Sequence, residues 1–506
     1  MNITKLLLLF YFFTLFFSCQ KNDNKIEFTF LQLNDVYEIA PIQGGQFGGL
    51  ARVETIHKEL LQENKNTLLF MAGDFLNPSL LGTLKVDGET IRGKQMVEVM
   101  NAMNFDVVAF GNHEFDLPLK DLQKRLNESN FPWISANVKL KTTEATIPFY
   151  KEIDSKKVPL HETFIKELTD IDGTKIKIGF ISVCIPSNPK DFVEYGNMFV
   201  KARASYAAIK DSVDVVFGLT HVKIVNDKRI AKLLPNVPLI MGGHEHTNSY
   251  DTIGNVRIAK ADANAKTVYI HKIVHDKKTK KTTVTSELKE INASIKADAK
   301  VGAIVQKWQT VLSSKIKEII SNAEEIIFNT KEPLDGRDTP IRSTQTNLGV
   351  VITKAMSFAY DDTVDCALVN GGSIRIDDQL IGTITPVDIF RVLPYGGSVI
   401  KVKLKGRLLK RILDYGNLAT DTGAYLQRYN VAVFDDSWWI NGSAIDSNKT
   451  YTVAFSDYLL KGYDIPFLSE ENNEVLTIYR PTQTEIAWDI RRVVVAYLKL
   501  EAEKQL

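Results

Sequence analysis

The sequence predicts an α/β protein of at least two domains, and three observations lead to this prediction. The chain has 506 residues, more than one ordinary hydrophobic core accommodates. From Phe28 onward, short apolar runs alternate with helical patterns, which indicates a sheet covered by helices on both faces. The same alternation starts again near Asn347, after one long helical pattern.

Composition and net charge narrow the classes of function. The chain is 44% hydrophobic and 24% charged, which is typical of a globular protein. A formal net charge of +1 gives no electrostatic reason to bind a nucleic-acid polymer, so we expect no such partner. No protein partner is predicted either.

The N-terminus predicts export. Residues 1–19 contain one positive charge, Lys5, then an apolar run and the pair Ser18-Cys19, which indicates a signal peptide. A small residue before a cysteine resembles a bacterial lipobox, so we expect Cys19 to become the lipidated first residue of the mature protein. The lipid would anchor it to the envelope, on the periplasmic or outer-surface side. The alternatives are an ordinary signal peptide with an incidental cysteine and an uncleaved membrane anchor.

The first half contains predicted strands that end at polar side chains. We expect strands at residues 28–33, 67–71, 106–110, 133–137, 175–183, 214–219 and 237–241, and helices at 49–63 and 93–103. Five of these strands are followed closely by Asp35, Asp74, Asn112-His113, His221, and His244 with His246. Functional groups of layered α/β folds collect at the carboxyl ends of strands, so we expect these side chains to meet.

A long helical pattern connects the two halves. Residues 294–325 place apolar side chains at helical spacing, and we expect this helix to join the domains. In the second half we expect a helix at 347–360, a strand at 364–369 and a closing helix at 485–500. A further helix should begin at Thr385-Pro386, with threonine as its cap and proline in its first turn.

The polar residues at the strand ends predict a metal centre. Asp, Asn and His side chains without cysteine favour Mn, Zn or Fe over a thiolate zinc site. The expected ligands are Asp35, Asp74, Asn112, His221, His244 and His246. Six ligands are too many for one ion with an open position, so we expect two ions that share Asp74. His113 would protonate a departing oxygen or stabilise its charge, and Asp116 would orient the His113 ring.

These residues in this order resemble the signature of the calcineurin-like metallophosphoesterases. The matching segments are Asn34-Asp35, Gly73-Asp74, Gly111-Asn112-His113-Glu114, Thr220-His221 and Gly243-His244-Glu245-His246. The second half is similar to the C-terminal domain of the 5′-nucleotidase family. The segments that carry this likeness are Asn347-Leu348-Gly349, Asn370-Gly371-Gly372-Ser373-Ile374-Arg375 and Pro394-Tyr395-Gly396-Gly397.

The resemblance implies an architecture and roles for individual residues. It implies a four-layer α/β/β/α metallophosphoesterase domain at 26–290, a linker helix at 291–325 and an α+β substrate-binding domain at 326–506. Asp35, Asp74 and His246 would bind one metal ion. Asp74, Asn112, His221 and His244 would bind the other. His113 and Asp116 would form the catalytic dyad, Arg342, Asn370 and Arg375 would hold the nucleotide, and Tyr395 would stack on its base.

The implied function is the removal of phosphate from extracellular nucleotides, by direct attack of a hydroxide held between two metal ions. One alternative is a 2′,3′-cyclic nucleotide phosphodiesterase or a nucleotide-sugar hydrolase. Another is a non-catalytic, nucleotide-binding surface lipoprotein. Because the metals and the nucleotide-binding residues lie on different domains, the substrate would bridge them, and we expect the domains to rotate.

Two segments depart from the family's pattern. The first motif is usually Asp-x-His, whereas this chain has Asp35-Val36-Tyr37. Tyr37 could bind the metal as a phenolate, which favours ferric iron. Alternatively, Tyr37 does not bind the metal, and the ion then either has one ligand fewer or is coordinated by water. Near the C-terminus, Gly462 to Phe467 replaces a Gly-Gly-Asp-Gly segment that precedes an aromatic residue. The second base-stacking side chain is then Phe467, Tyr463 or absent.

Overall fold

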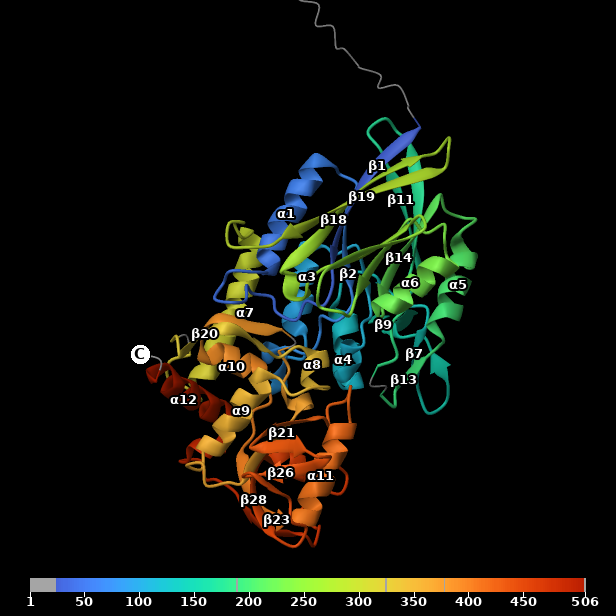
Figure 1. Cartoon of the computed structure of the whole chain (residues 1–506). Helices are drawn as coiled ribbons and strands as arrows, with labels where there is room; N and C mark the ends of the chain where they lie inside the picture. Colours follow the sequence, from blue (N-terminus) through green and yellow to red (C-terminus); the bar gives the residue numbers. More distant parts are fainter. Residues whose placement is uncertain (1–23, 188–189, 324, 377, 505–506) are drawn as a thin grey trace, which may run out of the picture.

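The computed structural model describes residues 24–187, 190–323, 325–376 and 378–504 (Figure 1). The predicted signal peptide and Cys19 lie outside these residues. No helix in the described ranges combines the length and the apolar character needed to span a bilayer.

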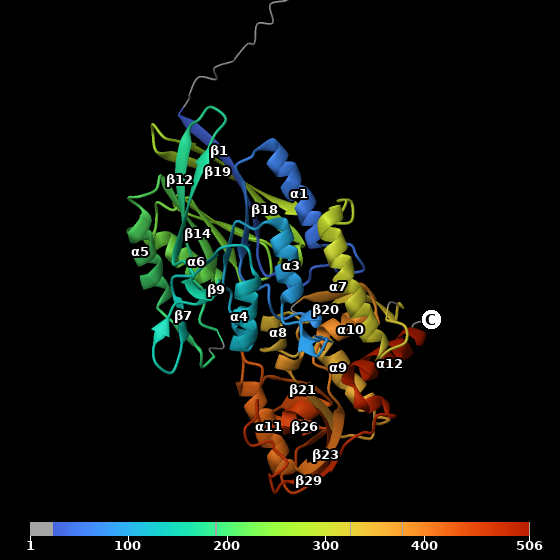
Figure 2. The ribbon, with the colours of Figure 1, turned by 180° about the vertical axis from the view of Figure 1, so that it is seen from behind.

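The first half contains two six-stranded sheets that pack face to face (Figures 1 and 2). The first sheet has the order β19 (Lys281–Glu290), β18 (Thr267–Asp276), β1 (Lys25–Leu33), β2 (Thr67–Ala72), β5 (Val107–Ala109) and β6 (Trp133–Ile134). The second has the order β11 (Thr163–Thr169), β12 (Lys175–Ile181), β14 (Val215–His221), β15 (Leu239–Gly243), β17 (Val256–Lys260) and β16 (Ser249–Ile253). Strands β1, β2, β5 and β6 are parallel, as are β12, β14, β15 and β17.

An aromatic core fills the space between these sheets. The Phe30 ring of β1 lies 5.6 Å from Phe180 of β12 and 4.9 Å from Phe217 of β14, measured between centroids. The central strands are buried on both faces, which is why they are nearly continuous apolar runs rather than alternating ones. Burial of each large apolar side chain contributes about 1.5–3 kcal/mol of transfer free energy, so this core holds the two sheets together.

Helices cover the outer faces of both sheets and complete the predicted α/β/β/α layers. The first sheet is covered by α1 (Leu50–Glu63), α3 (Lys94–Met103) and α4 (Leu119–Glu128). The second is covered by α5 (Met198–Ile209) and α6 (Ile224–Leu233). The sequence anticipated α1 and α3 to within one residue at each end.

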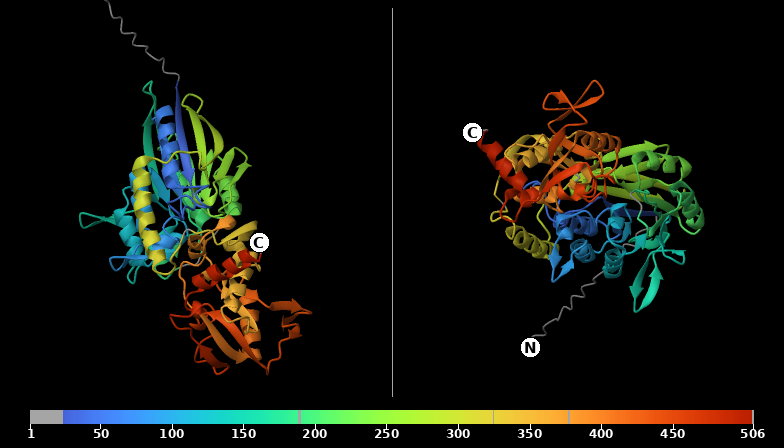
Figure 3. Two further views of the ribbon diagram at one scale, coloured as in Figure 1. Left: turned by 90° about the vertical axis from the view of Figure 1, so that its left-hand side faces the viewer. Right: turned by 90° about the horizontal axis from the view of Figure 1, so that it is seen from below.

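The connecting helix is shorter than predicted and packs on the first domain. Helix α7 (Ala299–Lys317) begins after Asp298, whose carboxylate accepts the Val301 N–H at 3.0 Å and so caps the helix. The apolar side of α7 joins the core beneath α1 and α3, and Figure 3 shows α7 alongside α1. Trp308 Nε1–H also donates to Glu98 of α3 at 2.9 Å. The crossover to the second domain therefore follows α7.

The second half is an α+β domain, as predicted. Its sheet has the order β24 (Leu426–Tyr429), β21 (Cys366–Asn370), β28 (Thr450–Ser456), β23 (Val399–Lys405) and β29 (Val475–Tyr479). One face is covered by α9 (Asn347–Phe358) and α12 (Ile490–Glu503), the other by α11 (Gly406–Leu418). Helix α10 (Pro386–Val392) has the expected cap at Thr385. Helix α12 begins five residues later than predicted, because Asp489 caps it by accepting the Arg491 N–H.

Short elements complete the two domains. In the first they are α2 (Leu80–Thr83), β3 (Lys85–Val86), β4 (Glu89–Thr90), β7 (Val138–Lys141), β8 (Thr146–Ile147), β9 (Tyr150–Ile153), β10 (Lys156–Pro159) and β13 (Val193–Tyr195). In the second they are β20 (Phe328–Asp335), α8 (Asp338–Ile341), β22 (Gln379–Ile384), β25 (Val431–Phe434), β26 (Ser437–Ile440) and β27 (Ser443–Ala444).

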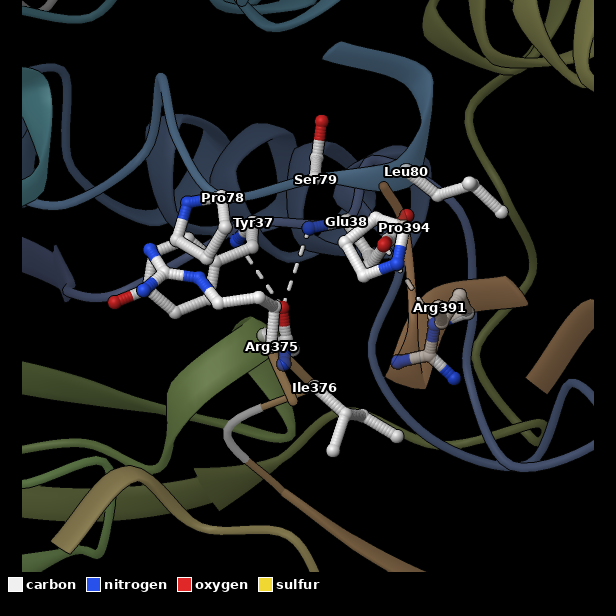
Figure 4. Close-up of a pocket in the computed structure, with 10 residues that line it drawn as sticks. Tyr37, Glu38, Pro78, Ser79, Leu80, Arg375, Ile376, Arg391 and Pro394 are labelled. Carbon is white, nitrogen blue, oxygen red and sulfur yellow. Dashed lines mark hydrogen bonds and ion pairs between the residues drawn. The ribbon is translucent and has the colours of Figure 1, made fainter. Parts of the chain in front are cut away.

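The two domains meet through ion pairs and one aromatic side chain. Glu38 of the first domain lies 3.6 Å from Arg391 of α10, and both side chains are nearly buried. Lys266 Nζ donates to Asp378 at 2.8 Å across the same boundary. Phe390 of α10 packs into the core of the first domain. Figure 4 shows this boundary, with Tyr37 and Glu38 on one side and residues of the second domain on the other.

Candidate metal centre and active site

The predicted ligands come together at the carboxyl edges of both sheets. The first sheet contributes Asp35, Asp74 and Asn112, which follow β1, β2 and β5. The second contributes His221, which ends β14, and His244 and His246, which follow β15. Because the parallel strands of each sheet end at the same edge, both sheets deliver their polar residues to one place.

The spacing between the ligand atoms suits metal ions. Asp74 Oδ2 lies 3.0 Å from His221 Nε2, and Asp35 Oδ1 lies 3.2 Å from His246 Nε2 and 3.8 Å from His221 Nε2. Ligand atoms of Asp35, Asp74 and His221 all lie within 4.8 Å of one another. Ligands of one ion each lie about 2.0–2.2 Å from it, which gives separations of this size.

Buried polar atoms at this edge also fit a bound cation. Asn112 Oδ1 is buried and has no hydrogen-bond partner among the described residues, while Asp35 Oδ1 and His221 Nε2 are buried against other ligand side chains. Leaving a buried polar atom unsatisfied costs about 1–3 kcal/mol, and coordination to a metal ion would remove that cost. The donors are oxygen and imidazole nitrogen, which suit Mn, Zn or Fe. The side chains present therefore fit a divalent metal ion.

Hydrogen bonds from neighbouring groups orient these ligands. His221 Nδ1–H donates to the Ala72 carbonyl at 2.7 Å, so Nε2 is the nitrogen presented to the site. Asp35 Oδ2 accepts the His244 N–H at 2.9 Å and the Asn34 side-chain amide at 2.8 Å, which turns Oδ1 inward. Asp74 Oδ1 accepts the His113 N–H at 2.7 Å. The side chains of His221, Asp35 and Asp74 are thus oriented by the protein itself.

The backbone at the ligands is strained. Asp35, Asp74, His244 and His246 have φ values of 53°, 56°, 96° and 59°, in the left-handed region. Such conformations cost non-glycine residues about 1–3 kcal/mol each and gather at functional sites. Gly111 makes room for this arrangement, because a Cβ there would lie 2.1 Å from Asp74 Oδ1. The strain indicates that the fold places these side chains for chemistry rather than for stability.

Opposite charges at the centre shift the pKa values of its residues. Burial alone would raise the pKa of Asp35, but the imidazoles of His246 and His221 outweigh burial and lower that pKa. For His221, burial lowers the pKa, yet Asp74 and Asp35 dominate and raise it to about 9. The metal-free centre therefore holds ionised carboxylates and a protonated His221, and metal binding displaces that proton.

His113 and Asp116 form the predicted pair. They lie at the two ends of a single 3-10 turn (His113–Asp116), which brings His113 Nδ1 to 2.7 Å from Asp116 Oδ2. Burial lowers the pKa of His113, but the nearby Asp74 and Asp116 carboxylates reverse this and raise it. Lys190 Nζ also lies 3.5 Å from Asp116 Oδ1. The geometry allows His113 to act as a cationic donor toward a reacting phosphate.

A cleft of about 460 Å³ connects this centre to the second domain. Its first-domain walls include Asn112, His113, Asp116, His244 and His246. Arg342 and Arg375 line it from the second domain, and Arg342 is held by Asp338 at 2.8 Å. Two guanidinium groups therefore face the dyad across the cleft, and planar guanidinium forks bind phosphate or sugar oxygens well.

Three predicted substrate-binding residues lie outside the lining of this cleft. Asn370 is buried, where its amide donates to Asp464 at 2.7 Å and its oxygen accepts from Ser373 at 2.6 Å. Both polar atoms of the Asn370 side chain are therefore engaged within the second domain, outside the lining of this cleft. Tyr395 is 56% exposed on the surface of the second domain.

Phe467, the first candidate for the second base-stacking residue, packs inside the second domain. Its ring lies 5.6 Å from the Tyr415 ring and 4.4 Å from the Arg411 guanidinium, both on α11. Arg411 therefore covers part of the ring, and Phe467 is partly buried against the core of this domain. Tyr463 is 73% exposed, with its ring 5.9 Å from Tyr458, so it is the better candidate for an aromatic contact with substrate.

Sequence reasoning gave no role to Glu114, which joins two ligand-bearing turns. Its carboxylate accepts the N–H groups of Asp74, Phe75, Leu76 and Gly111 at 2.6 to 3.1 Å. Burial, and then the Asp74 charge, raise the pKa of Glu114 to about 7. The position of Glu114 in the sequence, next to Asn112 and His113, is the feature that could have indicated this role.

Lys260, at the end of β17, was missed altogether. Its side chain is buried, donates to the carbonyls of Val222 and Gly243 at 2.5 and 2.7 Å, and pairs with Asp227 at 2.9 Å. It also contacts Glu245. Lys260 thereby holds the segments that carry His221 and His244. A lysine that ends an apolar strand was the only sign of this in the sequence.

Comparisons with known proteins agree with the geometry. The family model described as calcineurin-like phosphoesterase matches residues 28–248, and the one described as 5′-nucleotidase, C-terminal domain, matches residues 326–470. The crystal structure of a 5′-nucleotidase precursor from Thermus thermophilus has a TM-score of 0.68 at 20% identity, and the match covers 94% of this chain and 97% of that one. This likeness shows a shared fold.

Two curated relatives extend the comparison. A 5′-nucleotidase from Bos taurus is 28% identical over 425 residues, which cover 77% of this chain and 70% of that protein. Endonuclease YhcR from Bacillus subtilis is 26% identical over 450 residues, which cover 82% of this chain and 34% of that protein. The chain belongs to the 5′-nucleotidase family, in which a calcineurin-like phosphoesterase domain precedes a 5′-nucleotidase C-terminal domain, and it is a metal-dependent phosphoester hydrolase.

Proposed function

We propose that this protein removes phosphate from nucleotides outside the cytoplasm, as a lipid-anchored enzyme with two metal ions. The observation that carries the proposal is the shared cleft, in which Arg375 and Arg342 of one domain face His113 and Asp116 of the other. Relatives named 5′-nucleotidase support a nucleotide as the substrate. The catalytic class and the ligand side chains present favour this reading over a non-catalytic binding protein.

In the proposed mechanism the two domains hold one substrate between them. The guanidinium groups of Arg375 and Arg342 bind phosphate or ribose oxygens and direct the scissile phosphate toward His113. Asp116 keeps the His113 ring oriented through Nδ1, which leaves Nε2 of that ring to serve the phosphate. His113 then stabilises the charge that develops on the phosphoryl group or protonates the departing oxygen.

The metal assignment rests on the family resemblance, and the cluster of Asp35, Asp74 and His221 supports a metal at this place. Asp35, Asp74 and His246 would hold one ion, and Asp74, Asn112, His221 and His244 would hold the other. A pair of divalent ions supplies an activated water nucleophile and neutralises charge on the phosphoryl oxygens. Manganese, zinc and iron all suit these donors.

The direct test is phosphate release from nucleoside monophosphates by metal-reconstituted protein. We expect activity with Mn or Zn and a loss of at least about 10³-fold in Asp74→Asn, which removes the charge of the shared ligand. Asp251→Asn, in the ion pair of β16 with Lys228, is the matched control and should retain activity. Absence of phosphate release with every nucleotide and metal would refute the proposal.

A second substrate class is a phosphodiester. The similarity to endonuclease YhcR and the altered segment around Tyr463 support it. Side-by-side rates with nucleoside monophosphates, 2′,3′-cyclic nucleotides and nucleotide sugars distinguish the two classes. A higher kcat/KM for either diester class would replace the first assignment.

Export and lipidation rest on the sequence of residues 1–19. Labelled fatty acid should be incorporated into the protein expressed in a bacterial host, and Cys19→Ser should abolish incorporation and release the protein from membranes. Incorporation that persists in Cys19→Ser would exclude the lipobox assignment.

A further inference from the structure

We propose that the hydroxyl oxygen of Tyr37 is a ligand of the ion that Asp35, Asp74 and His246 hold. The inference rests on the proposed metal assignment. It adds a fourth protein ligand to one of the two ions, a tyrosine at the position where the family usually has a histidine. Tyr37 follows β1 by four residues and is only 3% exposed.

Distances place the Tyr37 oxygen among the ligand atoms. It lies 3.0 Å from His246 Nε2 and 3.4 Å from Asp74 Oδ2, and Asp35 Oδ1 is 3.2 Å from the same His246 nitrogen. Two ligands about 2.1 Å from one ion are separated by about 3.0 Å at a right angle and by about 3.4 Å at a tetrahedral angle. All three separations fall within that range, so the Tyr37 oxygen is spaced from its two neighbours as a ligand of the same ion would be.

The simplest alternative is a hydroxyl that only donates a hydrogen bond to the imidazole, and metal binding by His246 argues against it. An imidazole nitrogen has one lone pair, so His246 Nε2 cannot both bind a metal ion and accept a hydrogen bond. With His246 on the ion, the Tyr37 oxygen stays 3.0 Å from a nitrogen that no longer accepts from it. Another acceptor near the hydroxyl, Asp74 Oδ2, lies 3.4 Å away, which is longer than the roughly 2.5–3.0 Å of a good O–H···O hydrogen bond.

The backbone around Tyr37 holds the ring in this place. The N–H groups of Tyr37 and Glu38 both donate to Asn264 Oδ1, at 3.1 and 3.2 Å. Asn264 N–H in turn donates to the Asp35 carbonyl at 2.8 Å. Figure 4 shows Tyr37 and Glu38 joined by these hydrogen bonds. Tyr37 is thus tied to the same loop as the ligand Asp35.

Coordination has a defined chemical consequence. The phenol O–H bond breaks, the proton passes to solvent, and an oxygen lone pair forms the bond to the ion, whose oxidation state does not change. An anionic, hard oxygen donor suits Fe(III) better than the neutral imidazole of the usual pattern does. A ferric ion bound by a phenolate absorbs visible light through charge transfer, which gives a direct readout.

The test uses full-length, metal-free protein titrated with ferric citrate. We expect a visible charge-transfer band in the wild type, no band in Tyr37→Phe, and one fewer tightly bound ion per chain in that variant by elemental analysis. Tyr37→His should restore the metal content without the band. Tyr269→Phe, at a buried tyrosine whose hydroxyl contacts the Ser249 carbonyl, should behave as wild type.

A second measurement covers the case in which Tyr37→Phe does not fold. Resonance Raman spectra of the wild-type ferric protein should show enhanced phenolate ring vibrations. Their absence, or a band and metal content that persist in folded Tyr37→Phe, overturns the inference. Nucleotide hydrolysis without these signals refutes the ligand inference alone, whereas the signals without hydrolysis of any phosphoester refute the proposed function alone.

Discussion

Arg375 Nη2 of the second domain lies 3.3 Å from Asp116 Oδ2, the same oxygen that lies 2.7 Å from His113 Nδ1. The dyad of one domain is therefore in contact with Arg375 of the other, the arginine that we propose binds the substrate. Burial would raise the pKa of Asp116, but His113 and then Arg375 outweigh it and lower that pKa. Closure of the domains thus favours the ionised Asp116 that orients His113.

Arg375 should affect both substrate binding and turnover. Arg375→Ala removes the guanidinium from the cleft and from Asp116, and we expect kcat/KM to fall by about 10²-fold or more. Arg337→Ala is the control, because Arg337 lines the same cleft but pairs with Asp335 at 2.7 Å. Steady-state kinetics with one nucleotide decide the matter, and equal losses in the two variants would contradict a specific role for Arg375.

Lys260→Met should weaken one metal site and destabilise the fold. The change leaves the Asp227 carboxylate buried without its cation, which costs about 3–5 kcal/mol when a buried pair is broken. It also frees the segments that hold His221 and His244, so affinity for one of two ions should fall while the other persists. Urea unfolding and calorimetric titration with Zn measure the two effects. Lys272→Met, at an exposed pair with Glu63, should change neither.

Glu38→Gln should loosen the contact between the domains. The substitution removes the charge that faces the nearly buried Arg391, although Asp388 still lies 3.3 Å from that guanidinium. We expect a cost of about 1–3 kcal/mol to the docked arrangement. Small-angle X-ray scattering should then report a larger radius of gyration than in the wild type. An unchanged scattering curve, matching that of the surface variant Glu63→Gln, would show that other contacts dominate.

His271 should make stability depend on pH. It is fully buried, contacts Gln32 at 2.9 Å and Ser286 at 2.8 Å, and burial lowers its pKa to about 3. Below its unfolded pKa of about 6.5 the unfolded chain binds a proton that the folded protein excludes, so stability is lost as pH falls. His271 contributes up to about 1.4 kcal/mol per pH unit between about pH 6 and 4.

Denaturant unfolding at several pH values tests this contribution. His271→Gln should show a shallower loss of stability with acid than the wild type. The exposed His161 provides the control variant, His161→Gln, whose pH dependence should match the wild type. Parallel curves for wild type and His271→Gln would assign the acid sensitivity to other groups.

The metal ligands could be anticipated because each directly follows an apolar run, where parallel strands present their ends. Asp35, Asp74 and His221 needed no tertiary information to be singled out. Lys260 and Glu114 could not be found in this way, because their roles arise only when backbone groups distant in sequence converge on one charged side chain. The ends of some helices differ from the prediction because of local capping. Helix α7, for example, begins after its N-cap Asp298 and not at the start of the apolar pattern.

The pairing of the sheets and the packing of Phe467 depend on long-range contacts. The apolar runs indicate buried strands. The strands of both sheets are equally apolar, however, so the local sequence does not show which strand belongs to which sheet. Phe467 follows a glycine-containing segment that resembles a substrate loop, and only the position of α11 shows that Tyr415 and Arg411 cover its ring.

The division of ligands between two sheets also sets the order of events in maturation. Asp35 and His246 are separated in sequence by most of the first domain, and they lie on two sheets that are packed together by the aromatic core. A partly synthesised or unfolded chain therefore cannot assemble the centre. Metal binding at this centre therefore requires the folded domain, so we expect the metal content to reflect the metals available where that domain folds.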